Sequence, residues 1–155
     1  MRWSVCCLST QGKCRIESPG WHGCACVQVW TTMAADMITV LLVDDDGRFR
    51  RIARRMLTED GLKVVAEAAD GRTALEAVSE WTPDVVLLDI GLPDIDGREV
   101  ARRLREGGSG ATVVLISSRD ADYGQRVADG VAAGFIPKDE LSRERIQAIA
   151  GPSPR

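Results

Sequence analysis

The sequence lacks several features that would place it in a class at once. No apolar run approaches the ~18 residues that span a bilayer, and no basic patch followed by an apolar stretch opens the chain. No GxxxxGK(S/T) or GxGxxG motif follows a predicted strand to hold a nucleotide. The net charge of −3 argues against a generally basic nucleic-acid binder. We therefore expect a cytoplasmic protein without membrane contact or direct DNA binding.

Cysteine and histidine are absent beyond residue 26. The first 26 residues contain all of them, namely Cys6, Cys7, Cys14, His22, Cys24 and Cys26. Their spacing is poor for paired zinc knuckles, and an odd number of cysteines without an export signal is poor for a disulfide framework. A third interpretation is a start codon set too early, because Met33 and Met37 come just before the regular pattern. We expect residues 1–36 to be a disordered or non-native extension, 37–150 one domain, and 151–155 a tail.

Short apolar runs alternate with helical patterns from residue 37 onward. Strands are predicted at 38–43, 62–69, 85–88, 112–116 and 134–137. The helices between them are indicated by apolar residues at helical spacing: Phe49, Ile52, Ala53, Met56 and Leu57; Ala74, Leu75, Val78 and Trp81; Val100, Ala101 and Leu104; Ile146, Ile149 and Ala150. A further weak helix is predicted within 120–130. This alternation predicts an α/β fold with a doubly wound parallel sheet and helices on both faces.

Polar side chains follow the predicted strands directly. Asp44, Asp45 and Asp46 follow the first strand and Asp89 the third, while Ser117 and Lys138 follow the last two. Because binding sites in such sheets lie at the carboxyl ends of the strands, these groups are expected to gather at one edge.

Clustered carboxylates repel one another unless a cation neutralises them. Mg²⁺ prefers such oxygen ligands, and with it bound one carboxylate could attack a phosphoryl donor. A lysine and a serine hydroxyl would then stabilise the phosphoryl oxygens. The inventory therefore favours phosphoryl chemistry.

Four motifs resemble those of the receiver domain of two-component response regulators, over about residues 37–150. They are Val43-Asp44-Asp45, the segment from Leu87 to Gly97, Ile116-Ser117-Ser118, and Phe135-Ile136-Pro137-Lys138. Lys138-Asp139 is similar to receivers attached to LuxR-type output domains. No output domain follows in this sequence, so the resemblance is to a stand-alone receiver with a short last helix. It implies a flavodoxin-like sheet of five strands in the order 2-1-3-4-5.

The resemblance also implies roles for individual residues. Asp89 would accept the phosphoryl group, and Mg²⁺ would be held by Asp44, Asp45, Asp89 and the backbone carbonyl of Gly91. Ser117 and Lys138 would contact the phosphoryl group, and Phe135 would be the aromatic switch that moves inward when the hydroxyl is recruited. The donor would be a sensor histidine kinase or a phosphotransfer protein, with an unknown downstream effector. Such a protein is no enzyme beyond its own Mg²⁺-dependent phosphorylation and dephosphorylation.

Two other functions remain open. Val43-Asp44-Asp45-Asp46-Gly47 also resembles the start of haloacid-dehalogenase-like phosphatases, with Asp44 as nucleophile and Asp46 as acid/base. Arg48 stands where that family has Thr or Val, and its later acidic pair is missing. The other alternative is a receiver-like interaction module.

Several charged residues have a simpler interpretation. Asp46, Asp84, Asp94 and Asp96 are expected to be turn or cap residues. The arginines of the first helix are either a solvated face or a docking surface for a kinase or phosphotransfer partner: Arg48, Arg50, Arg51, Arg54 and Arg55.

Overall fold

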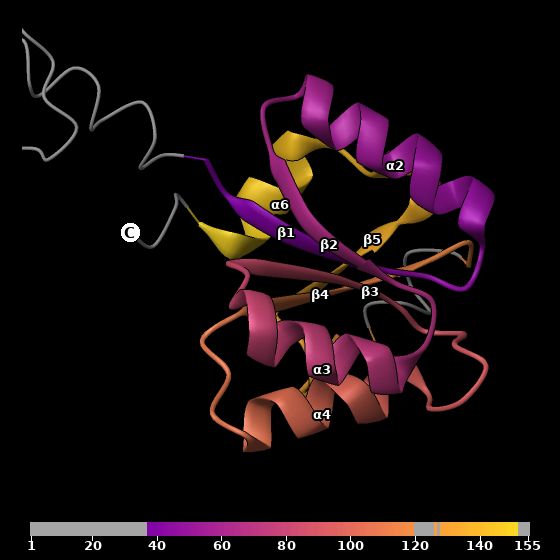
Figure 1. Cartoon of the computed structure of the whole chain (residues 1–155), viewed down its shortest axis with the longest axis vertical. Helices are drawn as coiled ribbons and strands as arrows, with labels where there is room; N and C mark the ends of the chain where they lie inside the picture. Colours follow the sequence, from indigo (N-terminus) through magenta and orange to yellow (C-terminus); the bar gives the residue numbers. More distant parts are fainter. Residues whose placement is uncertain (1–36, 120–125, 127, 152–155) are drawn as a thin grey trace, which may run out of the picture.

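The computed structural model describes residues 37–119, 126 and 128–151. Its centre is one parallel sheet of five strands in the order β2-β1-β3-β4-β5 (Figure 1), which confirms the predicted fold class and strand order. The strands are β1 (Thr39–Val43), β2 (Lys63–Ala68), β3 (Val85–Asp89), β4 (Thr112–Ser117) and β5 (Gly134–Pro137). The helices are α2 (Gly47–Glu59), α3 (Gly71–Trp81), α4 (Gly97–Glu106) and α6 (Arg143–Ala150), and a 3-10 turn spans Lys138–Glu140. The predicted extension and most of the weak helix at 120–130 lie outside the described residues.

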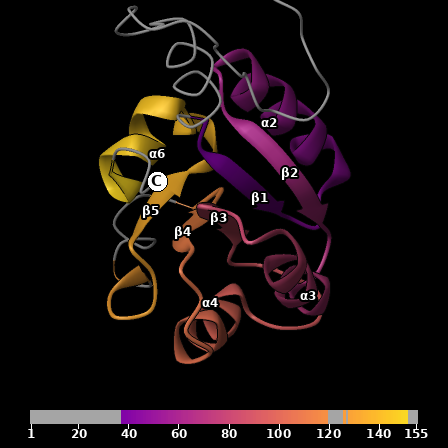
Figure 2. The ribbon, with the colours of Figure 1, turned by 60° about the vertical axis from the view of Figure 1, so that its left-hand side comes forward.

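The helices cover both faces of the sheet. Helices α2 and α6 lie on one face, and α3 and α4 lie on the other (Figures 1 and 2). Alternate residues of β1, β3, β4 and β5 supply the two cores: in β1, Val40 and Leu42 pack with the α2 side, whereas Leu41 and Val43 pack with the α3 side. In β2 a register shift against β1 breaks this alternation, so that Val64 packs with the α2 side and Ala66 and Ala68 with the α3 side. Because β1, β3, β4 and β5 are buried on both faces, their sequences are almost continuously apolar, whereas the edge strand β2 is only partly buried and contains Lys63 and Glu67.

Side-chain caps fix where the helices begin. Asp46, Asp70, Asp96 and Ser142 each precede a helix and accept a hydrogen bond from a backbone N–H in its first turn. Such oxygens satisfy amides that have no partner within the helix. The capping roles expected for Asp46 and Asp96 are thus observed.

Three details differ from the sequence-based expectations. Ile52, expected on the inner face of its helix, is 67% exposed, because Ala53 and Leu57 already fill the contact with the sheet. Trp81, also expected on the inner face, is the last residue of α3 and is 49% exposed, whereas Ala74, Ala77 and Val78 of the same helix are buried. Asp84 is neither a simple turn nor a cap residue: it is buried and accepts hydrogen bonds from the Thr39 backbone N–H and hydroxyl at 2.9 and 2.6 Å.

The helices of the described ranges are also short in membrane terms. None of them is long and apolar enough to cross a bilayer.

Candidate phosphoacceptor and metal site

The register of the sheet brings the polar strand ends to one level. Val43 of β1 pairs with Leu88 of β3, so Asp44 and Asp89 follow at neighbouring positions. Ser117, the last residue of β4, pairs with Pro137 of β5, and Lys138 comes next. Four strands that are separate in the sequence therefore deliver carboxylates, a hydroxyl and an ammonium group to the same edge.

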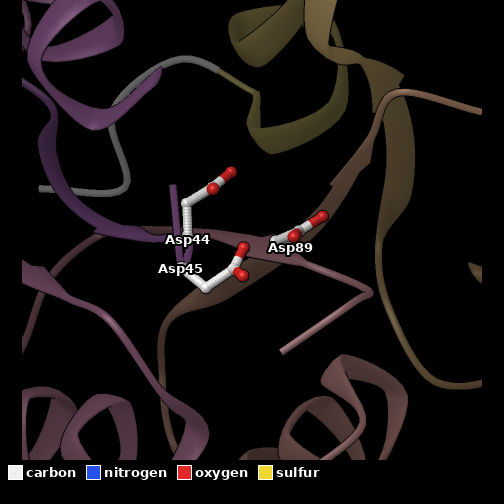
Figure 3. A group of neighbouring side chains, drawn as sticks. All are labelled: Asp44, Asp45 and Asp89. Carbon is white, nitrogen blue, oxygen red and sulfur yellow. The ribbon is translucent and has the colours of Figure 1, made fainter. Parts of the chain in front are cut away.

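Three aspartates form a compact acidic cluster there, which we call the acidic cluster (Asp44, Asp45 and Asp89). One carboxylate oxygen from each lies within 4.8 Å of the others. Figure 3 shows the three side chains leaving two adjacent strand ends side by side. The Asp44 side chain is fully buried, Asp89 is nearly so, and Asp45 is exposed. The cluster thus reaches from the core to the surface.

Lys138 is the cation that faces this cluster. Its Nζ lies 2.6 Å from Oδ2 of Asp44 and 3.4 Å from Oδ2 of Asp89. The same Nζ lies 4.7 Å from the centre of the Phe49 ring of α2, a cation–π distance. Burial by itself would lower the pKa of Lys138, but the two carboxylates outweigh it and the pKa is raised. Lys138 therefore stays charged at neutral pH.

The pKa of the Asp89 carboxyl is also set by opposing effects, and the net shift is upward. Burial raises the pKa of its carboxyl, and the charge of Asp44 adds to this rise. Lys138 and the backbone amide of Gly91 oppose the rise without cancelling it. The ionised carboxylate of Asp89 is thus held in the folded protein at a cost.

The donor set fits a hard divalent cation. Oδ1 of Asp44 accepts a hydrogen bond from the Asp46 backbone N–H at 2.9 Å. Its other oxygen, Oδ2, is buried without a well-directed hydrogen bond from the described residues, so its close contact with Lys138 is ionic. Three carboxylates face one ammonium group, which leaves negative charge that Mg²⁺ would neutralise with the oxygen ligands it prefers.

The other residues expected at the site lie around this cluster. Ser117 is 8% exposed, and its Oγ accepts a hydrogen bond from the Arg119 backbone N–H at 3.2 Å. Phe135 is 7% exposed and packs in the core on the α3 side. Gly91 is exposed, and a Cβ built on it would be 3.7 Å from Oδ2 of Asp89.

Three residues that contribute to the site were not singled out for it from the sequence. The Phe49 ring covers Lys138. The Arg50 guanidinium donates to the Asp44 carbonyl and lies 3.5 Å from Glu67 of β2, which fixes the turn carrying the acidic pair. A Cβ on Gly97 would lie 2.1 Å from the Asp89 carbonyl oxygen, so this position admits only glycine. The Asp-Gly pair at 96–97 was a usable signal for the last, but the first two depend on long-range packing.

The geometry opposes the phosphatase alternative. Asp46, its acid/base, is exposed and occupied in capping α2 through the Arg48 backbone N–H at 2.8 Å. Asp44, its nucleophile, is buried and engaged by Lys138. That alternative also gives no role to Asp89, the residue on which the site converges.

Comparisons with known proteins agree with this geometry. The response regulator receiver domain matches residues 40–150. The response regulator GacA of Pseudomonas viridiflava is 38% identical over 115 residues, which are 73% of this chain and 54% of that protein. A protein-glutamate methylesterase/protein-glutamine glutaminase of Alkalilimnicola ehrlichii is 40% identical over 134 residues, 74% of this chain and 33% of that protein. The chain thus spans between a third and about half of these curated relatives.

Solved structures show the same architecture. The signal receiver domain of NarL from Mycobacterium tuberculosis is 34% identical with a TM-score of 0.68, covering 75% of this chain and 98% of that one. A two-component response regulator of the LuxR family from Aurantimonas sp. SI85-9A1 is 30% identical with a TM-score of 0.65, covering 76% and 91%. Since both the strand-end geometry and a match over most of the sequence point the same way, the chain belongs to the receiver domains of two-component response regulators, a family of phosphoacceptor switches.

Proposed function

We propose that Asp89 is the residue that accepts the phosphoryl group in this receiver. The observation that carries the proposal is the convergence of Asp44, Asp45, Asp89 and Lys138 at one sheet edge, with Asp89 next to both the acidic pair and the lysine. We also propose that residues 37–150 form the functional unit and that residues 1–36 contribute nothing to this chemistry.

The acidic cluster holds Mg²⁺ in this proposal. Asp45, the exposed member, would hold the ion directly, and buried Asp44 would do so largely through water. Asp89 and the backbone carbonyl of Gly91 would complete the protein ligands. When bound, Mg²⁺ neutralises charge on the phosphoryl oxygens and on the cluster.

The chain's own residues then carry out the transfer. An oxygen of the ionised Asp89 carboxylate forms a bond to phosphorus, while the bond from phosphorus to the donor nitrogen of a phosphohistidine, or to the donor oxygen of acetyl phosphate, breaks. The departing group keeps the electron pair, and the product is an acyl phosphate on Asp89. Lys138, already 3.4 Å from Asp89, pairs with the phosphoryl group, and the Ser117 hydroxyl donates to one of its oxygens. Phe135 is the aromatic switch, which moves inward when the Ser117 hydroxyl is recruited to the phosphoryl group.

The partner is a sensor histidine kinase or a phosphotransfer protein. Helix α2 flanks the acidic cluster, and its exposed surface combines Ile52, which is 67% exposed, with Arg48, Arg51 and Arg55. An apolar contact ringed by cations suits an amphipathic partner surface that carries acidic residues. The downstream effector is unknown, and we propose neither direct DNA binding nor catalysis on a separate substrate.

Phosphorylation by acetyl phosphate tests the proposal. The protein is incubated with Mg²⁺ and labelled acetyl phosphate, and the label is tested for the acid lability and hydroxylamine sensitivity of an acyl phosphate. We expect such a label in the wild type and none in Asp89→Asn, whereas Asp139→Asn, a charge-matched surface change next to Lys138, keeps it. Turnover of phosphomonoesters would instead support the phosphatase alternative, and the absence of label would support an interaction module.

A further inference from the structure

The loop that follows Asp89 is tied to a helix from a different part of the chain. Oδ1 of Asp94 accepts a hydrogen bond from the Gly71 backbone N–H at 2.7 Å, and Oδ2 accepts one from the Arg72 backbone N–H at 3.0 Å. Gly71 and Arg72 are the first two residues of α3, more than twenty positions earlier in the sequence. A single carboxylate thus binds the start of α3 with both of its oxygens.

Two aspartates share the first amides of this helix. Asp70, which precedes α3, accepts from the Thr73 backbone N–H at 2.8 Å. Asp94 takes the two amides before it, so a residue of the loop completes the cap of α3. Hydrogen bonds from amides to an ionised carboxylate are stronger than neutral ones, and the helix dipole favours the negative charge. These two hydrogen bonds are therefore strong for an exposed side chain such as Asp94.

Packing reinforces the tie between loop and helix. A Cβ on Gly71 would lie 2.7 Å from Cγ2 of Val100 and 3.1 Å from Cβ of Ile95. Gly71 is buried, so the loop and the first turn of α4 press directly on its backbone. Only glycine permits this approach at position 71.

The loop between β3 and α4 contributes backbone groups, rather than side chains, to the candidate site. Backbone bonds fix its two ends, from the Ile90 N–H to the Ile116 carbonyl at 3.2 Å and from the Gly97 N–H to the Ile90 carbonyl at 3.0 Å. Between these ends lies Gly91, whose amide favours the charged form of Asp89. Gly91 has no side chain that could hold it in place, so its position depends on how the rest of the loop is held.

We propose that Asp94 is a positioning residue for the phosphoacceptor site. By binding the N-terminus of α3, it holds the loop so that the Gly91 backbone stays beside Asp89 and is ready to contribute its carbonyl to Mg²⁺. This inference rests on the proposed function of the acidic cluster. It adds a residue that touches neither the metal nor the phosphoryl group and acts through the backbone.

A matched pair of variants tests this role. Asp94→Ala and Asp70→Ala each remove one carboxylate from the same helix end, but only Asp94 also belongs to the loop. Three quantities are measured for each variant. Calorimetric titration gives the Mg²⁺ affinity, and acetyl phosphate labelling of Asp89 is followed at low and at saturating Mg²⁺. Hydrogen exchange of the Gly91 amide is measured without Mg²⁺. For Asp94→Ala we expect an affinity loss of about tenfold, within the range for residues that support metal ligands. Labelling should be slowed at low Mg²⁺ and largely restored at saturation, and Gly91 exchange should be faster.

The control and the conservative variant separate positioning from other effects. Asp70→Ala should leave Mg²⁺ affinity and Gly91 exchange close to wild type, and Asp94→Asn, which keeps one acceptor oxygen, should lie between Asp94→Ala and wild type. An equal affinity loss in both alanine variants would assign the effect to charge or helix capping and overturn the proposal, as would an unchanged Asp94→Ala. A wild type that takes up no label would instead count against the proposed function. Faster Gly91 exchange in Asp94→Ala alone would still support the tie in that case.

Discussion

Asp44 and Asp89 are both buried carboxylates that face Lys138, but they differ in their distance from it. Asp44 is fully buried and takes the shorter contact with Lys138, whereas burial and the charge of Asp44 raise the pKa of Asp89. A bound cation would therefore favour the ionised carboxylate of Asp89. At the scale of single residues, the raised pKa of the Asp89 carboxyl supports its proposed role as the reactive group.

The first prediction concerns the charge on Asp89. Its pKa is raised in the folded state, so its contribution to stability is full below the unfolded pKa and is lost as pH rises through the folded value. At pH 7.5 without Mg²⁺, Asp89→Asn should therefore raise the free energy of unfolding, and the gain should shrink as pH falls toward about 4, the ordinary pKa of aspartate. Urea unfolding in EDTA at several pH values measures this. A destabilised variant at pH 7.5 would show that Lys138 already satisfies the carboxylate.

The second prediction concerns Gly97. Because a Cβ there would lie 2.1 Å from the Asp89 carbonyl oxygen, Gly97→Ala must displace the backbone at Asp89, the proposed acceptor. We expect a loss of roughly 1–3 kcal/mol in unfolding free energy and slower labelling of Asp89. Gly110→Ala is the control, since a Cβ at Gly110 meets nothing within 4 Å. Equal behaviour of the two variants would contradict the close contact.

The site could be predicted from the sequence only where residues stand at strand ends. Asp44, Asp89, Ser117 and Lys138 follow apolar runs, and parallel strands bring such positions together. The contacts that complete the site, such as the Phe49 ring over Lys138, join residues with no fixed spacing in the sequence. Local patterns contain no signal for them.

At the scale of elements, the opposite edge of the sheet has its own polar link. Asp84 lies directly before β3, and both its carboxylate and its backbone N–H bond to Thr39, the first residue of β1. This link aligns β1 and β3 at their starts, and the register then carries the alignment to Asp44 and Asp89 at their ends. It illustrates how a buried polar group can specify strand pairing.

The third prediction tests that link. Asp84→Ala leaves the partly buried backbone N–H and hydroxyl of Thr39 without their acceptor, which should cost about 1–3 kcal/mol of unfolding free energy. Asp84→Asn, which keeps one acceptor, should lose less. Because the link lies at the far ends of the strands, the labelling rate of the folded variant should stay near wild type. Urea unfolding and acetyl phosphate labelling together check this, and a large loss of labelling in the folded fraction would show coupling along the strands.

The elements themselves were largely predictable. The bounds of each strand found in the described ranges differ by about one residue at most from the expected ones. For β1, β3, β4 and β5 this is because runs buried on both faces are distinctive. The residues that the helices turn toward the sheet were predicted less accurately than the strands. Ile52 and Trp81 fit the helical spacing, but spacing alone does not show which of the spaced residues contact the sheet.

At the scale of the whole molecule, two apolar cores on either side of the sheet support the fold, and the acidic cluster lies at the edge between them. Burial, and the neighbouring charge of Asp44, disfavour the ionised carboxylate of Asp89 in the metal-free state. Mg²⁺ binding should therefore be linked to global stability.

The fourth prediction follows from this linkage. At a free Mg²⁺ concentration tenfold above its dissociation constant, the free energy of unfolding should rise by about 1.4 kcal/mol. Asp45→Asn should lose most of this gain, whereas Asp139→Asn should retain it. Thermal or urea unfolding at constant ionic strength measures the effect. Equal stabilisation of both variants would indicate a general salt effect rather than a site at the acidic cluster.

The central claim, that Asp89 receives the phosphoryl group, can be tested at the level of the modified atom. The protein is phosphorylated with acetyl phosphate and Mg²⁺ and reduced with borohydride, which converts an aspartyl phosphate to homoserine, and the peptides are sequenced by tandem mass spectrometry. Our account predicts homoserine at position 89, dependent on Mg²⁺. Homoserine at position 44 or 45, with aspartate intact at 89, would contradict it.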